Sequence, residues 1–269
     1  MVDTQLLKQL REATKAPFKD CKEALENSDG DFEEAKEYLR KKWAKKADEK
    51  AERETNEWMV KIDSNDQRTC WIKLGCETDF VAKSDDFQEL AWKILDKFIN
   101  DFDQLESIDS LEEGYLEETI NPMIKDYVWK IWENIKLLDV FVDSEVGFVY
   151  THPGSQIASV VYYEADWADN VEDVAKDIAL QAAAMNPQYW KVEDIPEEQK
   201  ESLKEEFKEE FKDSWKPENV IENIVEWKLA KHFGEVVLME QPSIKDDSKK
   251  VKDLLPDSFT FKSFRRVSI

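Results

Sequence analysis

Hydrophobic residues recur every three or four positions over the first part of the chain, which is the period of an amphipathic helix. The apolar positions are Leu6, Leu7 and Leu10, then Phe18, Cys21, Ala24 and Leu25, and finally Phe32, Ala35 and Leu39. Pro17 marks a break before the second stretch, and Asp31, with Glu34 three residues further on, has the spacing of a capping box at the start of the third. Residues 4–52 are therefore predicted to form a compact bundle of three helices.

The pattern changes after a mixed-charge segment. Residues 41–54 (KKWAKKADEKAERE) carry few large apolar side chains and are predicted to form a solvated helical linker. Apolar and polar positions then alternate in EWMVKID and RTCWIKL, which flank SNDQ and predict a β-hairpin. A helix is expected from about Asp86 to Phe102, and a further helix is expected to end in YVWKIWENIKLLDV (127–140). The buried face of the first of these helices is predicted to contain Phe87, Leu90, Ala91, Ile94, Leu95 and Phe98.

The order of a hairpin followed by a helix occurs a second time. The segments VGFVYTH and QIASVVYYEA flank a PGS turn, and VEDVAKDIALQAAAM is amphipathic. The two halves differ in sequence but share the order of their elements, which predicts an internally duplicated α+β unit.

Residues 191–232 have the pattern of two charged amphipathic helices joined near SWKP. Their apolar seams are thin and consist of Leu203, Phe207 and Phe211 in one helix and Val220, Ile224, Val225 and Leu229 in the other. This pattern predicts a protruding helical hairpin. The remaining chain returns to strand patterns in EVVLMEQP and FTFKSFRRVSI.

Charge and composition narrow the classes of function. The 269 residues carry a formal net charge of −23, so the chain repels phosphate backbones and direct binding to nucleic acid is not expected. No apolar run approaches the roughly 20 residues of a membrane span, and the N-terminal segment lacks the pattern of a signal peptide. The three cysteines are Cys21, Cys70 and Cys76. We therefore expect a cytoplasmic protein with free thiols.

The segment GCETDFVAKSDDF (75–87) concentrates the candidate chemistry. It suggests either a catalytic site on Cys76 and Asp79 or a surface wedge on Phe80. A thiol nucleophile requires a histidine and an orienting acid, and neither His152 nor His232 stands in a recognisable pattern around Cys76. The sequence also lacks the Cys and His spacings of metal sites and the Gly-rich loops that bind phosphate. An enzyme has no positive support and no cofactor is expected, although folding could still bring a Cys–His pair together.

Several segments together resemble one family. CETDFVAKSDDF is similar to the signature of elongation factor Ts, the exchange factor of bacterial and organellar translation. LLKQLREATKAPFKDCKEAL (6–25) is similar to the family's L-R-x-x-T-G-A-G-x-x-D-C-K-x-A-L. KIWENIKL, KDIALQAAAMNPQY and IVEWKLAKHFGEVVLMEQP resemble its K-I-G-E-N-I, K-D-I/L-A-M and I-V-E-G segments. The blocks follow the family order over nearly the whole chain, which makes the joint resemblance strong.

The resemblance implies an α+β architecture that agrees with the patterns above. It would contain a bundle similar to ubiquitin-associated (UBA) domains, a linker, and a duplicated core of antiparallel sheets and helices with an inserted helical hairpin. The expected parts are a UBA-like domain at 1–40, a linker helix at 41–55, a core N-subdomain at 56–140, a core C-subdomain at 141–190 and 233–269, and an arm at 191–232.

The resemblance also implies a function, which is nucleotide exchange on the GTPase elongation factor Tu. In the family, the T-D-F segment meets the GTPase domain and disturbs the helix and the Mg²⁺ environment beside the nucleotide; the matching residues are Asp79 and Phe80. The residues expected to contact the partner are Arg11, Phe18, Thr78, Asp79, Phe80, Val81, Ala82, Lys83, Ile131, Trp132, Glu133, Asn134 and His152. Alternatives are an adaptor that keeps the fold but does not exchange nucleotide, and a thiol enzyme that uses Cys76. The arm could also pair two copies of the chain.

The chain departs from the family pattern at several tryptophans. The family usually has Gly where this sequence has Trp43, Trp58, Trp132, Trp167, Trp215 and Trp227. Gly suits positive φ and close backbone approach, whereas Trp needs a large pocket. One hypothesis is that the source organism reads UGA as Gly and that these positions are recoded glycines; true divergence is the alternative. TKAP also replaces Thr-Gly-Ala-Gly, and the chain stops at Ile269, before the end of the usual family tail, so a C-terminal contact is expected to be missing.

Overall fold

The computed structural model describes residues 3–14, 16–50, 52–165, 171–212 and 214–268, with residues 43–49 and 129 described by their backbone only. The chain divides into two compact units, which we describe in turn. The first consists of Met1–Ser144 and Pro153–Gln156; the second consists of Glu145–His152 and Ile157–Ser268.

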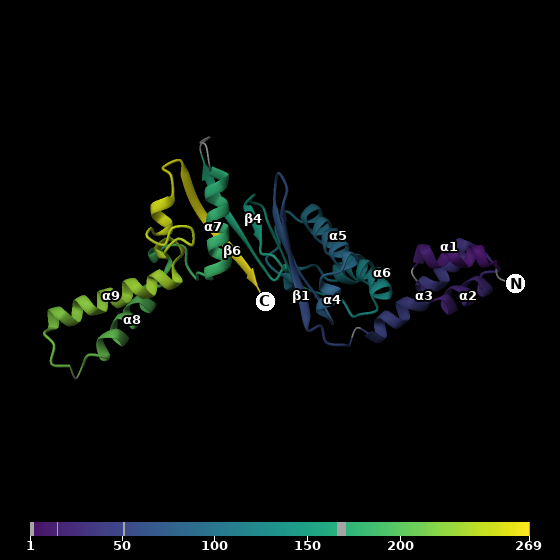
Figure 1. Ribbon diagram of the computed structural model, residues 1–269, viewed down its shortest axis with the longest axis horizontal. Coiled ribbons are helices and arrows are strands. Elements are labelled where there is room, and N and C mark those ends of the chain that lie inside the picture. Colours follow the sequence, from purple (N-terminus) through teal and green to yellow (C-terminus); the bar gives the residue numbers. More distant parts are fainter. Residues whose placement is uncertain (1–2, 15, 51, 166–170, 213, 269) are drawn as a thin grey trace. The chain divides into compact units, whose positions relative to one another are not determined.

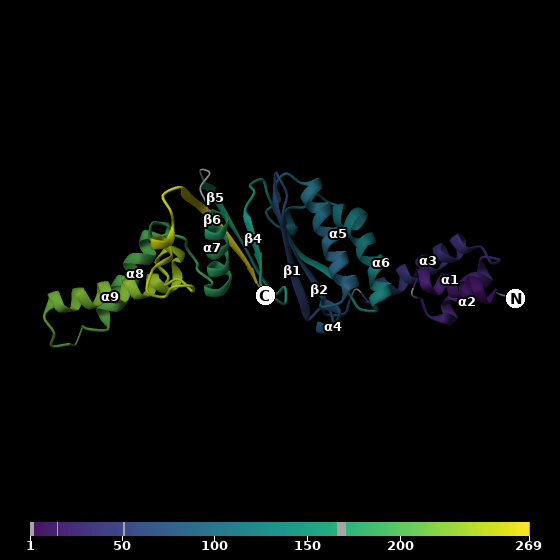
Figure 2. The same cartoon turned by 45° about the horizontal axis from the view of Figure 1, so that its top comes forward.

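The first unit begins with three helices, as the sequence predicts: α1 (Thr4–Thr14), α2 (Phe18–Asn27) and α3 (Phe32–Lys50) (Figure 2). Their shared core contains Leu7, Leu10, Ala16, Cys21, Ala24, Leu25, Ala35 and Leu39. Asp31 caps α3, because its Oδ1 accepts a hydrogen bond of 2.8 Å from the backbone N–H of Glu34. Helix α3 runs without a break through the position at which the sequence predicts a linker to begin.

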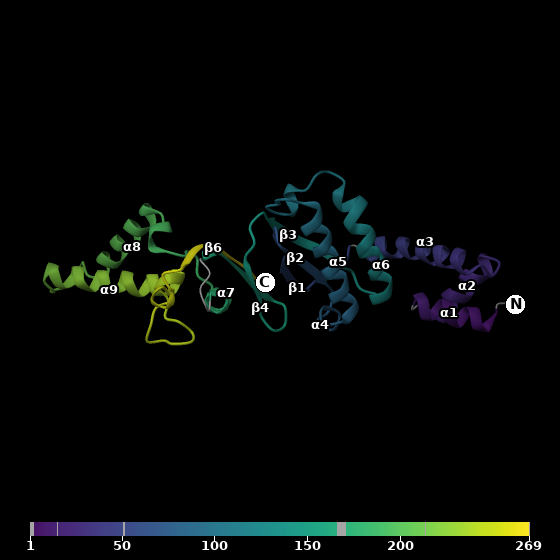
Figure 3. The same ribbon diagram turned by 90° about the horizontal axis from the view of Figure 1, so that it is seen from above.

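A three-stranded antiparallel sheet follows, with β1 (Glu57–Ser64), β2 (Thr69–Cys76) and β3 (Lys136–Asp143) in the order β1-β2-β3. The predicted β1–β2 hairpin is confirmed, and Asn65 Oδ1 closes its turn by accepting from the N–H groups of Gln67 and Arg68. Helices α5 (Asp85–Asp101) and α6 (Asn121–Ile131) lie side by side along the sheet (Figure 3). All six apolar residues predicted for the inner face of α5 are buried.

The predicted helix through YVWKIWENIKLLDV is wrong in its second half. Helix α6 ends at Ile131, because Trp132 adopts a left-handed conformation (φ 65°, ψ 16°) that an α-helix cannot continue. The residues after it form β3, which pairs with β2 from Thr69 to Gly75. The sequence pattern missed this strand because pairing with β2, rather than local periodicity, decides its conformation. Short helices complete the unit: α4 (Asp79–Ala82), η1 (Ile108–Ser110) and η2 (Leu116–Ile120).

The second unit also contains a three-stranded antiparallel sheet. Its strands are β4 (Phe148–Thr151), β5 (Ile157–Ala165) and β6 (Phe259–Ser268), in the order β4-β5-β6. Helix α7 (Val171–Met185) packs against this sheet (Figure 1). The predicted PGS turn is observed, with positive φ at Gly154 and Ser155. In both sheets, a hairpin is completed by a third strand that arrives from later in the chain.

Helices α8 (Glu197–Glu209) and α9 (Glu218–Val236) form the predicted hairpin, which we call the arm (Figure 1). The expected strand in EVVLMEQP is wrong: α9 continues to Val236, and η4 (Leu238–Glu240) follows. The remaining short helices are η3 (Val192–Asp194) and η5 (Val251–Leu254). The apolar seam of the arm is thin, since Val225 is the one residue of α9 that is buried. The Lys228 ammonium adds to it by lying over the rings of Phe207 and Phe211.

The fold is α+β, as the sequence predicts, with helices and antiparallel sheets in separate layers. None of the helices in the described ranges is long and apolar enough to cross a membrane.

Candidate functional site

The segment after β2 forms a capped helical turn, α4, that we call the TDF loop (residues 77–84). Thr78 is its N-cap, with an extended backbone (φ −131°, ψ 155°) and a side-chain oxygen that accepts from the N–H of Val81 at 3.5 Å. Ser84 then caps α5 by accepting from the N–H of Phe87. Two successive caps fix both ends of the loop, because each satisfies backbone donors that a helix start leaves open.

Phe80 projects from this loop into solvent with 82% of its surface exposed. Its neighbours Val81 and Ala82 are half-buried and pack against the core formed by the first sheet and α5. The backbone of the loop is therefore fixed on the core by Val81 and Ala82, while the Phe80 ring remains in solvent. Exposing a phenylalanine side chain forgoes roughly 1.5–3 kcal/mol of burial free energy.

The charged residues of the loop are also on its surface. Lys83 Nζ lies 3.0 Å from Asp79 Oδ2, and both side chains are more than half exposed. Such exposed pairs contribute little to folding stability, with a median of about 0–1 kcal/mol. The pair can therefore be exchanged for contacts with another molecule at small cost.

The turn after α6 lies directly against the TDF loop. Glu133 Oε2 accepts from the backbone N–H groups of Glu77 (3.1 Å) and Thr78 (2.9 Å), and Glu133 Oε1 accepts from the Thr78 hydroxyl (2.6 Å). In return, Glu77 Oε1 accepts from the backbone N–H of Asn134 at 2.7 Å. The structure thus brings together two segments, CETDF and WENI, that lie more than fifty residues apart in the sequence.

Three residues at this junction were not singled out from the sequence. Glu77 supplies the return carboxylate, and Arg53 Nη1 lies 3.4 Å from it. The Arg53 carbonyl accepts from Asn134 Nδ2 at 2.6 Å, and Lys50 Nζ donates to the Trp132 carbonyl at 2.6 Å. Lys50 and Arg53 belong to a segment that reads as solvated from its charge pattern alone. Of these three residues, only Glu77 could have been found from the sequence, because it lies inside the CETDF signature.

Cys76 is fully buried at the end of β2, and its thiol donates to the Thr78 carbonyl at 3.3 Å. Burial, followed by the charge of Glu133, raises the pKa of Cys76 to about 12. A thiol with this pKa is almost entirely protonated at neutral pH, and the thiolate is the nucleophile. Cys76 therefore behaves as a small buried hydrophobic residue. No group of three or more metal-ligating side chains gathers anywhere in the described ranges.

The other residues expected to contact a partner lie in different places. Arg11 is exposed near the end of α1, and Phe18 is 56% exposed at the start of α2. Ile131 is half-buried against the first core, and Trp132 beside it is 42% exposed. Asn134 is only 3% exposed, so its side chain serves the fold in this conformation. His152 belongs to the second unit, where its Nδ1 lies 3.2 Å from the Tyr150 hydroxyl.

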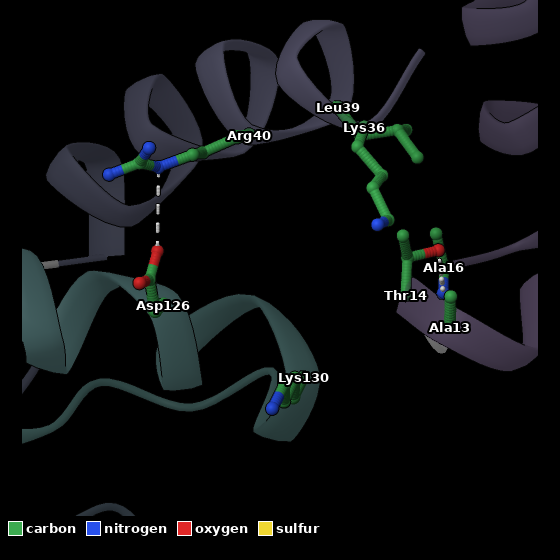
Figure 4. Close-up of a pocket in the computed structure, with 8 residues that line it drawn as sticks. All are labelled: Ala13, Thr14, Ala16, Lys36, Leu39, Arg40, Asp126 and Lys130. Atoms are coloured by element: carbon green, nitrogen blue, oxygen red, sulfur yellow. Dashed lines mark hydrogen bonds and ion pairs between the residues drawn. The ribbon is translucent and has the colours of Figure 1, made fainter. Parts of the chain in front are cut away.

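A cavity of about 390 Å³ opens between α3 and α6 in the first unit (Figure 4). Its lining residues are Ala13, Thr14, Ala16, Lys36, Leu39, Arg40, Asp126 and Lys130. Arg40 and Asp126 face each other, with Nε and Oδ1 3.7 Å apart (Figure 4). None of these residues belongs to the TDF loop, so the candidate site is a projecting surface and not a cavity.

The structure describes the side chains of four of the six tryptophans at family glycine positions; the side chain of Trp43 and all of Trp167 lie outside the described residues. Trp132 has a positive φ of 65°, a conformation that favours Gly. Trp215 and Trp227 are 92% and 63% exposed on the arm. The buried Trp58 Nε1 has no hydrogen-bond acceptor within the described part of the chain. Lysine ammonium groups lie over the rings of Trp58, Trp132 and Trp227, so three of these indoles make cation–π contacts.

Known proteins that are similar to this chain share one family. The family model described as elongation factor TS matches residues 77–269. The elongation factor Ts of Hydrogenobaculum sp. (strain Y04AAS1) is 41% identical over 100% of this chain and 98% of its own length. That of Aquifex aeolicus (strain VF5) is 38% identical over 96% of this chain and 93% of its own length. The family match covers most of the chain, and these relatives are at least 38% identical over nearly all of it. The chain therefore belongs to the elongation factor Ts family.

Proposed function

We propose that this protein accelerates the release of GDP from the GTPase elongation factor Tu by inserting Phe80 beside the partner's nucleotide and Mg²⁺ site. Family membership supports a role in translation elongation. Asp79 and Phe80 match the family's T-D-F segment in the sequence resemblance. The observation that carries the proposal is the exposed ring of Phe80 on an anchored loop.

Exchange of this kind requires no nucleophile and no cofactor. A factor that binds the nucleotide-free GTPase more tightly than the nucleotide-bound form weakens nucleotide binding by the same factor. Burying the Phe80 ring in the partner would yield roughly 1.5–3 kcal/mol, compared with about 1–3 kcal/mol for a typical coupling free energy between two sites. One side chain could therefore supply a large share of the coupling, with Asp79 and its neighbours acting on the Mg²⁺ environment.

The anchoring of the loop favours this mechanism. Thr78 and Ser84 cap its ends, and Val81 and Ala82 fix its inner face on the core. A loop that is ordered before binding avoids the entropic cost of ordering in the complex. The binding free energy of Phe80 is then available for displacing the nucleotide.

The test is the release of labelled GDP from elongation factor Tu. We expect the native chain to accelerate release and Phe80→Ala to lose about 10- to 150-fold of that acceleration, which corresponds to roughly 1.5–3 kcal/mol. Stability should be unchanged, because the ring is exposed. Ile244→Ala, which truncates an exposed apolar residue of the second unit (43% exposed), is the matched control. Full acceleration by Phe80→Ala would refute the wedge.

The wider contact surface and the domain division belong to the same proposal. Arg11, Phe18, Ile131, Trp132 and His152 would add contacts to the TDF loop. Residues 1–40, 41–55, 56–140, 141–190 with 233–269, and 191–232 would be the UBA-like domain, linker, two core subdomains and arm. The proposed site of action is the cytoplasm, where translation takes place.

An adaptor function is the second candidate, and it rests on the arm. Val220 and Trp227 are both exposed and lie seven residues apart on α9, which places them on one face of the helix. This face could bind another protein or a second copy of the chain. Binding of elongation factor Tu without acceleration of GDP release would favour the adaptor, and sedimentation equilibrium would reveal a dimer.

A further inference from the structure

We infer that Glu133 and Glu77 are positioning residues of the exchange site: they form a reciprocal clasp that holds the TDF loop in its binding conformation. The clasp consists of Glu77, Thr78, Glu133 and Asn134. The inference rests on the proposed exchange function for its effect on GDP release, but the clasp itself is a property of the free protein.

The geometry of the clasp is reciprocal. The carboxylate of Glu133 takes three donors from the TDF loop: two backbone N–H groups and the hydroxyl of Thr78, at 2.6–3.1 Å. The carboxylate of Glu77 takes the N–H of Asn134 from the opposite segment at 2.7 Å. Each segment therefore carries an acid that satisfies the backbone of the other. Hydrogen bonds to ionised acceptors are roughly twice as strong as bonds between neutral groups.

Thr78 connects the clasp to Phe80. Its hydroxyl proton points to Glu133, which directs the oxygen lone pairs towards the Val81 N–H and allows Thr78 to cap α4. Phe80 lies within this single turn, between the cap and the half-buried residues Val81 and Ala82. Loss of Glu133 would free the hydroxyl to rotate and would release two loop N–H groups to solvent. The direction of the Phe80 ring would then no longer be fixed.

The left-handed turn at Trp132 places Glu133 in reach. After α6 ends, the Trp132 N–H still bonds to the Val128 carbonyl at 2.8 Å, while its positive φ turns the chain away from the helix axis. The following residues therefore approach the TDF loop instead of continuing α6. Lys50 donates to the Trp132 carbonyl, and Arg53 contacts both Glu77 and Asn134, so the segment after α3 secures the clasp from a third side.

This arrangement assigns new roles within the matched signatures. Glu133 and Asn134 are expected from the resemblance to contact the GTPase directly. In the free protein the acceptor atoms of Glu133 are occupied by the loop, and Asn134 is buried. Their contribution to exchange is therefore indirect and passes through the orientation of the TDF loop.

The experiment combines amide hydrogen exchange in the full-length free protein with GDP release from elongation factor Tu. For Glu133→Ala, we expect the Glu77 and Thr78 amides to lose about 10- to 150-fold of their protection, the range that corresponds to one hydrogen bond to a charged group. The maximal rate of GDP release should fall by about 10-fold or more. The protein concentration at half-maximal rate should change less, because the outer contact surface is intact.

Paired variants separate positioning from general damage. Thr78→Val removes the hydroxyl at nearly constant volume, whereas Thr78→Ser keeps it, so the serine variant should retain the rate that the valine variant loses. Glu133→Gln should have amide protection and a rate of GDP release between those of the native protein and Glu133→Ala, because its side-chain oxygen can still accept hydrogen bonds from the loop. Glu113→Ala, which removes an exposed carboxylate of the same unit, is the control and should change neither measurement.

The outcomes are distinct. Unchanged protection of the Glu77 and Thr78 amides in Glu133→Ala would overturn the clasp. Lost protection with an unchanged rate of GDP release would overturn its role in exchange. If the native protein fails to accelerate GDP release at all, the proposed function fails, while amide exchange still decides whether the clasp orders the loop.

Discussion

Asn134 separates two views of the WENI segment, and replacing it with alanine provides a direct measurement. The family resemblance places Asn134 among the residues that touch the GTPase, whereas the structure buries its side chain to 3% exposure. Its Nδ2 donates to the Arg53 carbonyl at 2.6 Å, a bond that ties the segment after α3 to the turn after α6. The substitution removes this donor and leaves the carbonyl without it.

The cost follows from that bond. Arg53 is exposed, so water can replace the lost donor at its carbonyl, and the loss is that of one ordinary hydrogen bond, about 0.5–1.5 kcal/mol. For an m-value of about 2 kcal/mol per molar urea, the midpoint of unfolding of the first unit would fall by about 0.25–0.75 M. Asn100→Ala is the matched control, because Asn100 is exposed on α5 and its side chain bonds to Asp96 within the same helix. A surface change of this kind should stay within about 0.5 kcal/mol.

The assay is equilibrium urea unfolding of both variants, combined with the rate of GDP release from elongation factor Tu under conditions in which both variants are folded. We expect Asn134→Ala to lower the stability of the protein, whereas the affinity of the folded variant for elongation factor Tu should change little. An unchanged midpoint together with a clear loss of affinity would refute the reasoning, because it would show that the amide side chain acts at the interface.

Two further predictions concern the thiol and the tryptophans. Burial raises the pKa of Cys76 to about 12, so at pH 8 we expect iodoacetamide to label Cys76 in the folded protein at least roughly 10³-fold more slowly than in the urea-unfolded chain, as measured by mass spectrometry. Because the folded state holds this proton more tightly than the unfolded chain, Cys76 contributes fully to stability below the ordinary thiol pKa of about 8.5, and this contribution decreases as the pH rises from there towards 12. Rapid labelling of Cys76 in the folded protein would contradict its burial. If UGA is read as Gly in the source organism, intact-mass and peptide analysis of the native protein will show glycine at positions 43, 58, 132, 167, 215 and 227. Tryptophan at these positions would reject the recoding hypothesis and would leave Trp132 with the cost of about 1–2 kcal/mol that a left-handed conformation imposes on a residue with a Cβ.

Local patterns in the sequence determined most of the helices. The spacing of Phe87, Leu90, Ile94 and Phe98 matches the helical period, so the buried face of α5 could be identified without the fold. The three N-terminal helices and the arm follow from the same periodicity, and the two hairpins follow from their turn residues. The resemblance in ordered signature blocks identified the family, which the comparisons then confirmed.

The tertiary structure decided what periodicity does not encode. Whether IKLLDV continues a helix or becomes β3 depends on pairing with β2, and whether EVVLMEQP is a strand depends on α9 continuing to Val236. The placement of Glu133 against Thr78 depends on a left-handed turn and on a sheet that joins segments more than fifty residues apart. The sequence alone identified Phe80 as the candidate wedge, because that assignment needs only the motif. The direction in which Phe80 points is set by non-local hydrogen bonds to carboxylates, and these exist only in the folded chain.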